Sequence, residues 1–337
     1  MQIEPPTVDD RPIWDLWLSQ YELPVVLVAD ELGLFQFIAS EPAAHDSIGS
    51  HVGLDERATE ALLASLCALG YLVKRTARFH LTDLARTYLL PDSAFYWAPM
   101  LRDVGNGAAA ARDLLRRLRA DMLASDARIS ERWERGRITP EDARLSNQRF
   151  HSHSFPAALG VARNGDFTGV RRLLDVAGGS GCFAIALALR YPTLRCTVAD
   201  LAPVTADTQR YIRQYGTEER VDTHALNMFE DPWPAGYDAV FFSNVFHDWD
   251  PARRRDLARR SFDALPPGGR IYIHEMLLDD DADGPLAAAL FSVLMLNTRG
   301  KQFTATELCA LLRETGFENG TVTHTYGYYS LISALRP

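Results

Sequence analysis

The stretch 173-LLDVAGGSGCFAIALA-188 decides the fold class of the second half of the chain. It begins as a short apolar run, continues as a turn that contains Gly178, Gly179 and Gly181, and ends as an apolar segment. Glycine lets a backbone turn sharply and lets a ligand approach it closely. We therefore predict a buried strand, a ligand-binding turn and a helix, in that order.

The same alternation of strand and helix continues to the end of the sequence. Short apolar runs recur at 195-RCTVAD-200, 237-YDAVFFSNVF-246 and 268-GGRIYIHEMLL-278, with helical segments between them. Such alternation predicts an α/β domain built on a mostly parallel, doubly wound sheet. The final run, 320-GTVTHTYGYYSLISALRP-337, predicts an antiparallel hairpin at the edge of that sheet.

The first third of the sequence has a different rhythm. Helical apolar spacing at 23-LPVVLVADELGLFQFI-38 and 56-ERATEALLASLCALGYLV-73 leads into 71-YLVKRTARFHLT-82, which predicts two short strands around a basic turn. This order is typical of a winged-helix-like module. The module is rich in aromatic residues, which favours a homodimer interface, although these side chains could equally form its core.

We therefore expect three parts. Residues 1–105 form the winged-helix-like dimerisation domain, residues 106–165 form a helical linker that contributes to an acceptor pocket, and residues 166–337 form the catalytic domain.

Composition limits the function. The 337 residues are 47% hydrophobic and 23% charged, with a net charge of −9. An acidic chain without a long basic run is a poor nucleic-acid binder, so we expect no nucleic-acid partner. No apolar run approaches the length of a membrane span, and four scattered cysteines indicate reduced thiols, so we expect a cytoplasmic protein.

The spacing of the glycines limits which class of ligand the turn can bind. The turn reads G-G-S-G and not G-x-G-x-x-G, and no basic side chain stands ready for a pyrophosphate. Asp200 ends the next predicted strand, where a carboxylate suits the two hydroxyls of a ribose. An adenosine ligand without phosphates fits this pattern better than a dinucleotide.

Taken in order, "DVAGGSG", "NMFED", "SNVFHDWD", "LPPGGRIYIHEMLL" and "RGKQFTATELCALLRETGF" resemble the S-adenosylmethionine-dependent O-methyltransferases of the plant caffeic-acid type and their bacterial natural-product relatives. These relatives include metal-dependent C-methyltransferases that act on 2-oxo acids. The resemblance implies a Rossmann-like catalytic domain, a homodimer, S-adenosylmethionine as cofactor and a small-molecule acceptor.

The resemblance also implies which residues hold the cofactor: Asp175, Gly178, Gly179, Gly181, Asp200, Leu201, Asn227, Met228 and Ser243. Two of these positions depart from the family pattern. Asn227 stands where the family usually has Asp, although its amide oxygen can still accept from an adenine amino group. Ser243 stands where plant members often have Lys.

The run 242-FSNVFHDWD-250 predicts a buried strand that ends in His247 and Asp248. The resemblance implies catalytic roles for His247 as general base and for Glu275 as the carboxylate that orients it, and we place Asp248 with them. A near-neutral imidazole can take the proton of an acceptor hydroxyl. The acceptor pocket is expected to include Phe150, His151, Met295 and Asn297.

One departure suggests a second chemistry. Gln302 stands where the family commonly has a second carboxylate beside the base, so the general-base apparatus is weakened. If His151 met His247 and Asp248, the three would form a metal-binding set for Zn, Fe or Ni. Such a metal could chelate a 2-oxo acid and favour methylation of its C3.

Three functions therefore stay open. The first is O-methylation of a small hydroxylated acceptor, and the second is metal-assisted C-methylation of a 2-oxo acid. The third is a winged-helix regulator that senses a ligand through a methyltransferase-like domain, which the intact Asp200 and His247 disfavour. The sequence does not identify the acceptor.

Overall fold

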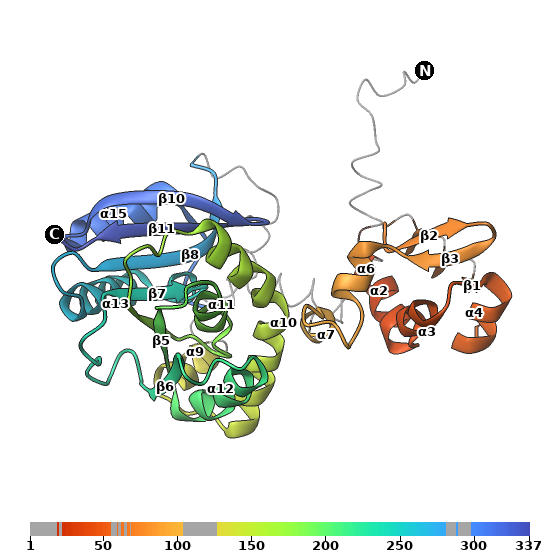
Figure 1. Ribbon diagram of the computed structural model, residues 1–337, viewed down its shortest axis with the longest axis horizontal. Helices are drawn as coiled ribbons and strands as arrows, with labels where there is room; N and C mark the ends of the chain where they lie inside the picture. Colours follow the sequence, from red (N-terminus) through yellow and green to blue (C-terminus); the bar gives the residue numbers. More distant parts are fainter. Residues whose placement is uncertain are drawn as a thin grey trace, which may run out of the picture. The chain divides into compact units, whose positions relative to one another are not determined.

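The computed structural model describes residues 22–54, 69–103, 127–280 and 298–337, with isolated positions at 19, 59, 62, 63, 66, 67 and 288. The chain divides into two compact units, Met1–Arg112 and Asp113–Pro337 (Figure 1). No helix among the described residues is both long and apolar enough to cross a membrane.

The described part of the first unit is helical with one small antiparallel sheet. Its helices are α2 (Glu22–Glu31), α3 (Leu34–Ser40), α4 (His45–Val52), α6 (Asp83–Tyr88) and α7 (Ala98–Arg102), and its strands are β1 (Ala43–Ala44), β2 (Leu72–Arg75) and β3 (Arg78–Leu81). The strand order is β1-β3-β2. The hairpin expected in residues 71–82 is therefore confirmed as β2 and β3.

The second unit is built on an eight-stranded sheet. Its strands are β4 (Arg172–Val176), β5 (Arg195–Asp200), β6 (Val221–Ala225), β7 (Ala239–Ser243), β8 (Arg270–Leu278), β9 (Phe303–Thr304), β10 (Glu318–Tyr326) and β11 (Tyr329–Leu335). The order is β10-β11-β8-β7-β4-β5-β6, with β9 beside β8. The central pairs are parallel, and β11 and β10 are antiparallel at the edge, as the sequence predicted.

Helices cover both faces of this sheet. They are α9 (Ala127–Glu134), α10 (Pro140–Asn164), α11 (Cys182–Arg190), α12 (Ala202–Gln214), α13 (Pro251–Ala264) and α15 (Ala305–Thr315). Side chains alternate along each strand, because successive residues of a strand point to opposite faces. Phe242 packs in the core under α13 and α15, whereas Phe241 contacts Phe183 of α11 with ring centroids 5.2 Å apart. The predicted α/β fold class is confirmed.

The strand order predicts a ligand site at the carboxyl ends of the central parallel strands. From β4 the chain moves outward through β5 and β6, and then crosses to the other side of β4 to form β7 and β8. Ligands bind at the carboxyl ends of parallel strands where the strand order reverses. The glycine turn, Asp200, Asn227 and His247 all follow the carboxyl ends of such strands.

Candidate active site

The glycine turn between β4 and α11 has an unusual backbone. Ala177, Gly179 and Gly181 all have positive φ angles, of 55°, 55° and 75°. Gly178 has no space for a side chain, because a Cβ there would lie 2.8 Å from both Asp175 and Val198. The three glycines of the motif therefore follow from backbone geometry and close packing.

Asp200 supports this turn from the end of β5. Its Oδ2 accepts a hydrogen bond from the N–H of Gly179 at 2.9 Å, and its Oδ1 accepts one from the N–H of Leu201 at 2.7 Å. Burial raises the pKa of Asp200 from 3.8 to about 6, although the two backbone donors lower it. Each carboxylate oxygen has a further lone pair, so Asp200 can still accept from a ligand.

Asp175 lies behind the turn. It is 1% exposed, and its Oδ2 has no hydrogen-bond partner among the described residues. Burial raises its pKa to about 8, against a backbone hydrogen bond from Ala184 that lowers it. A buried oxygen without a hydrogen-bond partner is a candidate acceptor for a donor group of a ligand, directly or through water.

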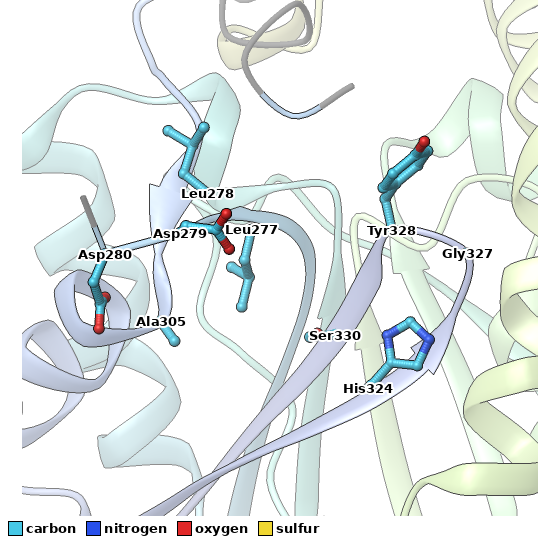
Figure 2. A pocket seen from close by; sticks show the side chains of 9 residues that line it. All are labelled: Leu277, Leu278, Asp279, Asp280, Ala305, His324, Gly327, Tyr328 and Ser330. Carbon is cyan, nitrogen blue, oxygen red and sulfur yellow. The ribbon is translucent and has the colours of Figure 1, made fainter. Parts of the chain in front are cut away.

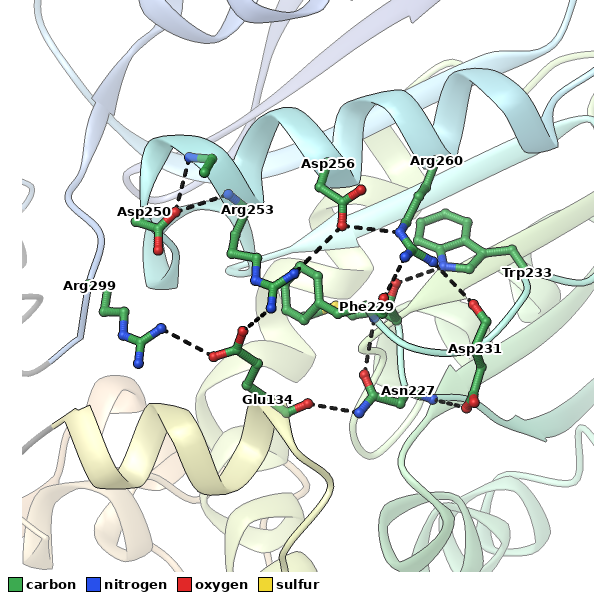
Figure 3. A network of polar contacts seen from close by, with 12 residues as sticks. Glu134, Asn227, Phe229, Asp231, Trp233, Asp250, Arg253, Asp256, Arg260 and Arg299 are labelled. Carbon is green, nitrogen blue, oxygen red and sulfur yellow. Dashed lines mark hydrogen bonds and ion pairs between the residues drawn. The ribbon is translucent and has the colours of Figure 1, made fainter.

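Asn227 follows β6 at the same edge and is held at both ends of its amide. Its Nδ2 donates to the backbone oxygen of Glu134 at 2.7 Å, and its Oδ1 accepts from the N–H of Phe229 at 3.1 Å (Figure 3). Met228 packs against the core, and its carbonyl accepts from the indole of Trp233 at 2.9 Å. Gly136 lies over this region, since a Cβ there would be 3.5 Å from Leu201.

A chain of charges fixes the end of α9 to the rest of the second unit. The carboxylate of Glu134 pairs with Arg253 of α13 and, at 3.2 Å, with Arg299. Beyond Arg253, Asp256 pairs with Arg260 at 3.1 Å (Figure 3). The network therefore joins α9, α13 and the segment before β9 on the side where Asn227 lies.

The structure corrects the predicted secondary structure around His247. Strand β7 ends at Ser243, and Asn244 has a positive φ of 54°, which turns the chain out of the strand. His247 then lies on the short 3-10 helix η2 (Phe246–Asp248). The predicted strand through residue 247 was wrong because a left-handed residue, which Asn tolerates, ends it.

His247 and Glu275 form a buried ion pair. Glu275 Oε2 lies 2.9 Å from Nδ1 of His247, and the two side chains are 4% and 1% exposed. Asp248 is more open, at 41% exposed, and its Oδ1 lies 3.8 Å from Nε2 of His247. Burial lowers the pKa of His247, but Glu275 and Asp248 outweigh it and raise the pKa from 6.5 to about 9.

The predicted "GKQFT" segment meets His247 directly. A Cβ on Gly300 would fall 1.7 Å from the backbone oxygen of His247, so only glycine fits there. The N–H of Arg299 donates to the backbone oxygen of Asp248 at 3.3 Å. Gln302 is 1% exposed and favours the charged form of His247, so it takes part in the environment of that histidine.

Among the described residues, the structure does not bring together the expected metal-binding set of His151, His247 and Asp248. His151 does not join His247 and Asp248, because its Nδ1 lies 2.9 Å from Ser180 Oγ and its Nε2 lies 3.0 Å from the hydroxyl of Tyr215. Within residues 127–280 and 298–337, as elsewhere in the described chain, no group of three His, Cys, Asp or Glu side chains could hold a metal ion. The face of α10 that carries His151 points to the glycine turn.

His153 lies two residues further along α10, and its pKa is affected by the charge of His247. Burial, with smaller effects of the charges of Arg149 and His247, lowers the pKa of His153 to about 4. Phe150 is 45% exposed and makes an edge contact with His153, with centroids 5.8 Å apart. Met295 and Asn297, also expected in the acceptor pocket, lie outside the described residues.

Ser243 is engaged with the neighbouring strand. Its hydroxyl lies 2.9 Å from Nδ1 of His274, whose Nε2 lies 3.1 Å from the hydroxyl of Thr325. Burial lowers the pKa of His274 to about 3. Ser243 therefore links β7 to a buried neutral histidine of β8.

A pocket of about 390 Å³ opens between the end of β8 and the β10–β11 hairpin (Figure 2). It is lined by Leu277, Leu278, Asp279, Asp280, Ala305, His324, Gly327, Tyr328 and Ser330. None of these lining residues was predicted as a site residue. Ser330 pairs with Glu275 across the sheet, so the pocket begins one strand away from the buried ion pair.

Comparison with known proteins identifies the family. Residues 112–318 match the family model described as the O-methyltransferase domain. The chain belongs to this O-methyltransferase family. A 3-hydroxy-5-methyl-1-naphthoate 3-O-methyltransferase of Streptomyces sahachiroi is 35% identical over 306 residues, which are 89% of this chain and 86% of the relative.

Two further comparisons extend this result. An L-tyrosine C(3)-methyltransferase of Streptomyces lavendulae is 28% identical over 274 residues, which are 79% of this chain and 74% of the relative. The crystal structure of human N-acetylserotonin methyltransferase in complex with S-adenosylmethionine superposes with a TM-score of 0.83, at 25% identity, and covers 99% of both chains. The expected class of enzyme, an S-adenosylmethionine-dependent methyltransferase, is thereby confirmed at the level of the family.

Sequence reasoning missed several residues that hold the site in place. Ser180 stands inside the quoted GGSG motif, and the i, i+4 spacing of Asn147 and His151 places both on one face of α10. Asn147 donates to Asp207 of α12 at 3.0 Å, so this face packs on α12. Nothing in the local sequence around Glu134 indicates its ion pairs.

Proposed function

We propose that this enzyme transfers a methyl group from S-adenosylmethionine to a hydroxyl of a small aromatic acceptor, with His247 as the general base. The observation that carries the proposal is the buried His247–Glu275 pair at the same sheet edge as the glycine turn and Asp200. The 35% identical relative is a naphthoate O-methyltransferase, which supports an aromatic hydroxyl as acceptor.

The residues at this edge fit the cofactor. Asp200 retains lone pairs for the two ribose hydroxyls. Asp175 has an oxygen without a partner among the described residues, which suits a cationic amino group. Leu201, Asn227 and Met228 would border the adenine, with Asn227 fixed in place by the end of α9.

S-adenosylmethionine, when bound, supplies an electrophilic methyl group on a positively charged sulfur. The chain supplies deprotonation and alignment. Glu275 beside Nδ1 of His247 favours a proton on that nitrogen. In the neutral imidazole the lone pair of Nε2 then takes the proton of the acceptor hydroxyl. The imidazolium that forms is stabilised by Glu275 and Asp248, while Gln302 takes the place of a further carboxylate.

The direct test is methyl transfer in vitro. Chelator-treated enzyme is incubated with S-adenosylmethionine and a panel of hydroxylated aromatic acids, alongside 2-oxo acids. We expect methylated products from the aromatic panel, without loss of rate in chelator. Methyl ethers lose the ionisable hydroxyl of the acceptor, so a pH titration of each product separates O-methylation from ring C-methylation. Products from the 2-oxo acids alone would contradict the proposal.

The relative named as an L-tyrosine C(3)-methyltransferase makes this distinction necessary. A phenolate carries negative charge on its oxygen and on the ring carbons ortho and para to that oxygen. The same base could therefore prepare either nucleophile, and the orientation of the acceptor would select the atom. A ring-methylated product with an intact hydroxyl would keep the methyl-transfer proposal and overturn its O-methyl part.

We also propose that residues 1–105 mediate homodimerisation. Exposed apolar side chains in this unit, such as Val28 at 44% and Leu84 at 46%, support an interface. Light scattering at micromolar concentration should give twice the chain mass of 37.6 kDa. A monomeric mass across that concentration range would contradict it.

A further inference from the structure

The backbone of the glycine turn has to be held from outside. Left-handed residues cost free energy unless glycine occupies them, and here Ala177 is one of three such residues within five positions. A turn of this kind persists when its surroundings fix it. Side chains from three different elements contact the turn.

Two of these side chains hold Gly179. Asp200 of β5 accepts from its N–H at 2.9 Å, and Thr208 of α12 donates to its carbonyl at 2.6 Å. Thr208 is fully buried, so its hydroxyl is fixed in place. Both contacts are made to the backbone of Gly179. They do not fix the side chain of the next residue, Ser180, which has another partner.

That partner is His151 of α10. Its Nδ1 lies 2.9 Å from Ser180 Oγ, and its Nε2 lies 3.0 Å from the hydroxyl of Tyr215, at the end of α12. Its ring is stacked on Phe155 and lies 4.4 Å from the ring of Tyr211, between centroids. The histidine is 7% exposed and Ser180 is 3% exposed, so water does not compete for the bond between them.

The charge state of His151 fits a bridging role. Burial, with a smaller effect of Arg210, lowers the pKa of His151 to about 4, so the ring is neutral at physiological pH. A neutral imidazole has one N–H and one bare nitrogen, and it therefore donates to one hydroxyl and accepts from the other. Tyr215 and Ser180 offer hydroxyls that can fill both roles.

We infer that His151 is a positioning residue that holds the glycine turn in its ligand-binding form through Ser180, and that it affects the reaction through cofactor affinity. The inference rests on the proposed function, because it takes the turn to be the cofactor site. His151 then has no part in acceptor binding. The row Tyr215–His151–Ser180 acts as a brace that connects α12, α10 and the turn.

The test compares variants in which the packing is kept and the hydrogen bonds are lost. In His151→Phe an aromatic ring remains between Phe155 and Tyr211, but neither hydroxyl has its partner. We expect S-adenosylhomocysteine to bind about tenfold more weakly by calorimetry, which corresponds to about 1.4 kcal/mol. The KM for S-adenosylmethionine should rise with it, while the KM for the acceptor stays unchanged.

Ser180→Ala removes the bond to the turn and should cause most of this loss. The double variant should lose no more affinity than His151→Phe alone, because the two changes share that bond. Tyr215→Phe removes the outer bond alone and should weaken binding less. These two variants carry the test if His151→Phe does not fold. Asn164→Ala is the matched control, since it removes a hydrogen bond from the other end of α10 to Thr325 and should leave cofactor affinity unchanged.

The outcomes separate the two proposals. Wild-type protein that fails to bind S-adenosylhomocysteine would overturn the proposed function. Wild-type binding that His151→Phe and Ser180→Ala both retain in full would overturn the brace alone. A rise in the KM of the acceptor without a change in cofactor affinity would likewise contradict it, and would return His151 to the acceptor pocket.

Discussion

Replacement of His247 by Asn is expected to lower the rate of methyl transfer about 100-fold to 10,000-fold at neutral pH, the range typical for loss of a general base. The Asn side chain can hydrogen-bond but cannot take a proton. Binding of S-adenosylhomocysteine should be retained, because His247 lies after β7 and not at the glycine turn. His224→Asn, on the exposed edge strand β6, is the matched control and should be as active as wild type.

The pH profile gives a second measure of the same residue. Because the pKa of His247 is raised to about 9, the neutral form that accepts a proton is a minor species at pH 7. The wild-type rate should therefore rise with pH, reach half of its maximum near pH 9 and level off above it. In His247→Asn the rate should instead follow ionisation of the acceptor itself. A variant with more than half of wild-type activity at pH 7 would exclude His247 as the base.

Replacement of Asp200 by Ala is expected to weaken cofactor binding about tenfold to 100-fold, since hydrogen bonds to a charged group contribute about 1.5–3 kcal/mol each. The change also removes the acceptor for the N–H of Gly179, so the turn loses a support. Asp263→Ala, at an exposed position of α13, is the control. Unchanged affinity for S-adenosylhomocysteine would remove Asp200 from the site.

Asp200 should also make cofactor binding depend on pH. Its pKa of about 6 means that the carboxylate is ionised above that pH and protonated below it. The ionised form accepts from ribose hydroxyls at both oxygens, whereas the protonated form loses an acceptor. Affinity should therefore fall as pH is lowered through about 6, and Asp200→Asn should abolish this dependence. A wild-type affinity that does not change between pH 5 and pH 7 would contradict the assignment.

Positions that depend on local pattern could be predicted from the sequence. The strand, GGSG and helix of residues 173–188 became β4, the turn and α11, because apolar runs and glycines act within a few residues. Asp200 ends β5 as expected. Strand β6 was not anticipated, because four of its five residues are polar or small and only Val221 is buried.

Positions that depend on how helices pack could not be predicted. His151 and His153 are two residues apart, so they point about 200° apart around an α-helix. Sequence spacing does not say which of the two faces meets the glycine turn and which meets His247. The expected metal-binding set required the face of α10 that carries His151 to point towards His247. The packing of α10 on α12 turns that face to the glycine turn instead.

The sequence by itself determined the class of fold, the order of β4, β5, β7, β8 and the edge hairpin along the chain, and the glycine turn and Asp200 at the ends of β4 and β5. These features follow from local periodicity and from backbone geometry that only certain residues tolerate. Only the tertiary structure decided that Glu275 contacts His247, that Gly300 packs on the backbone of His247, and that His151 contacts Ser180. Such contacts join residues far apart in the chain, and burial together with the neighbouring charges then shifts their pKa values.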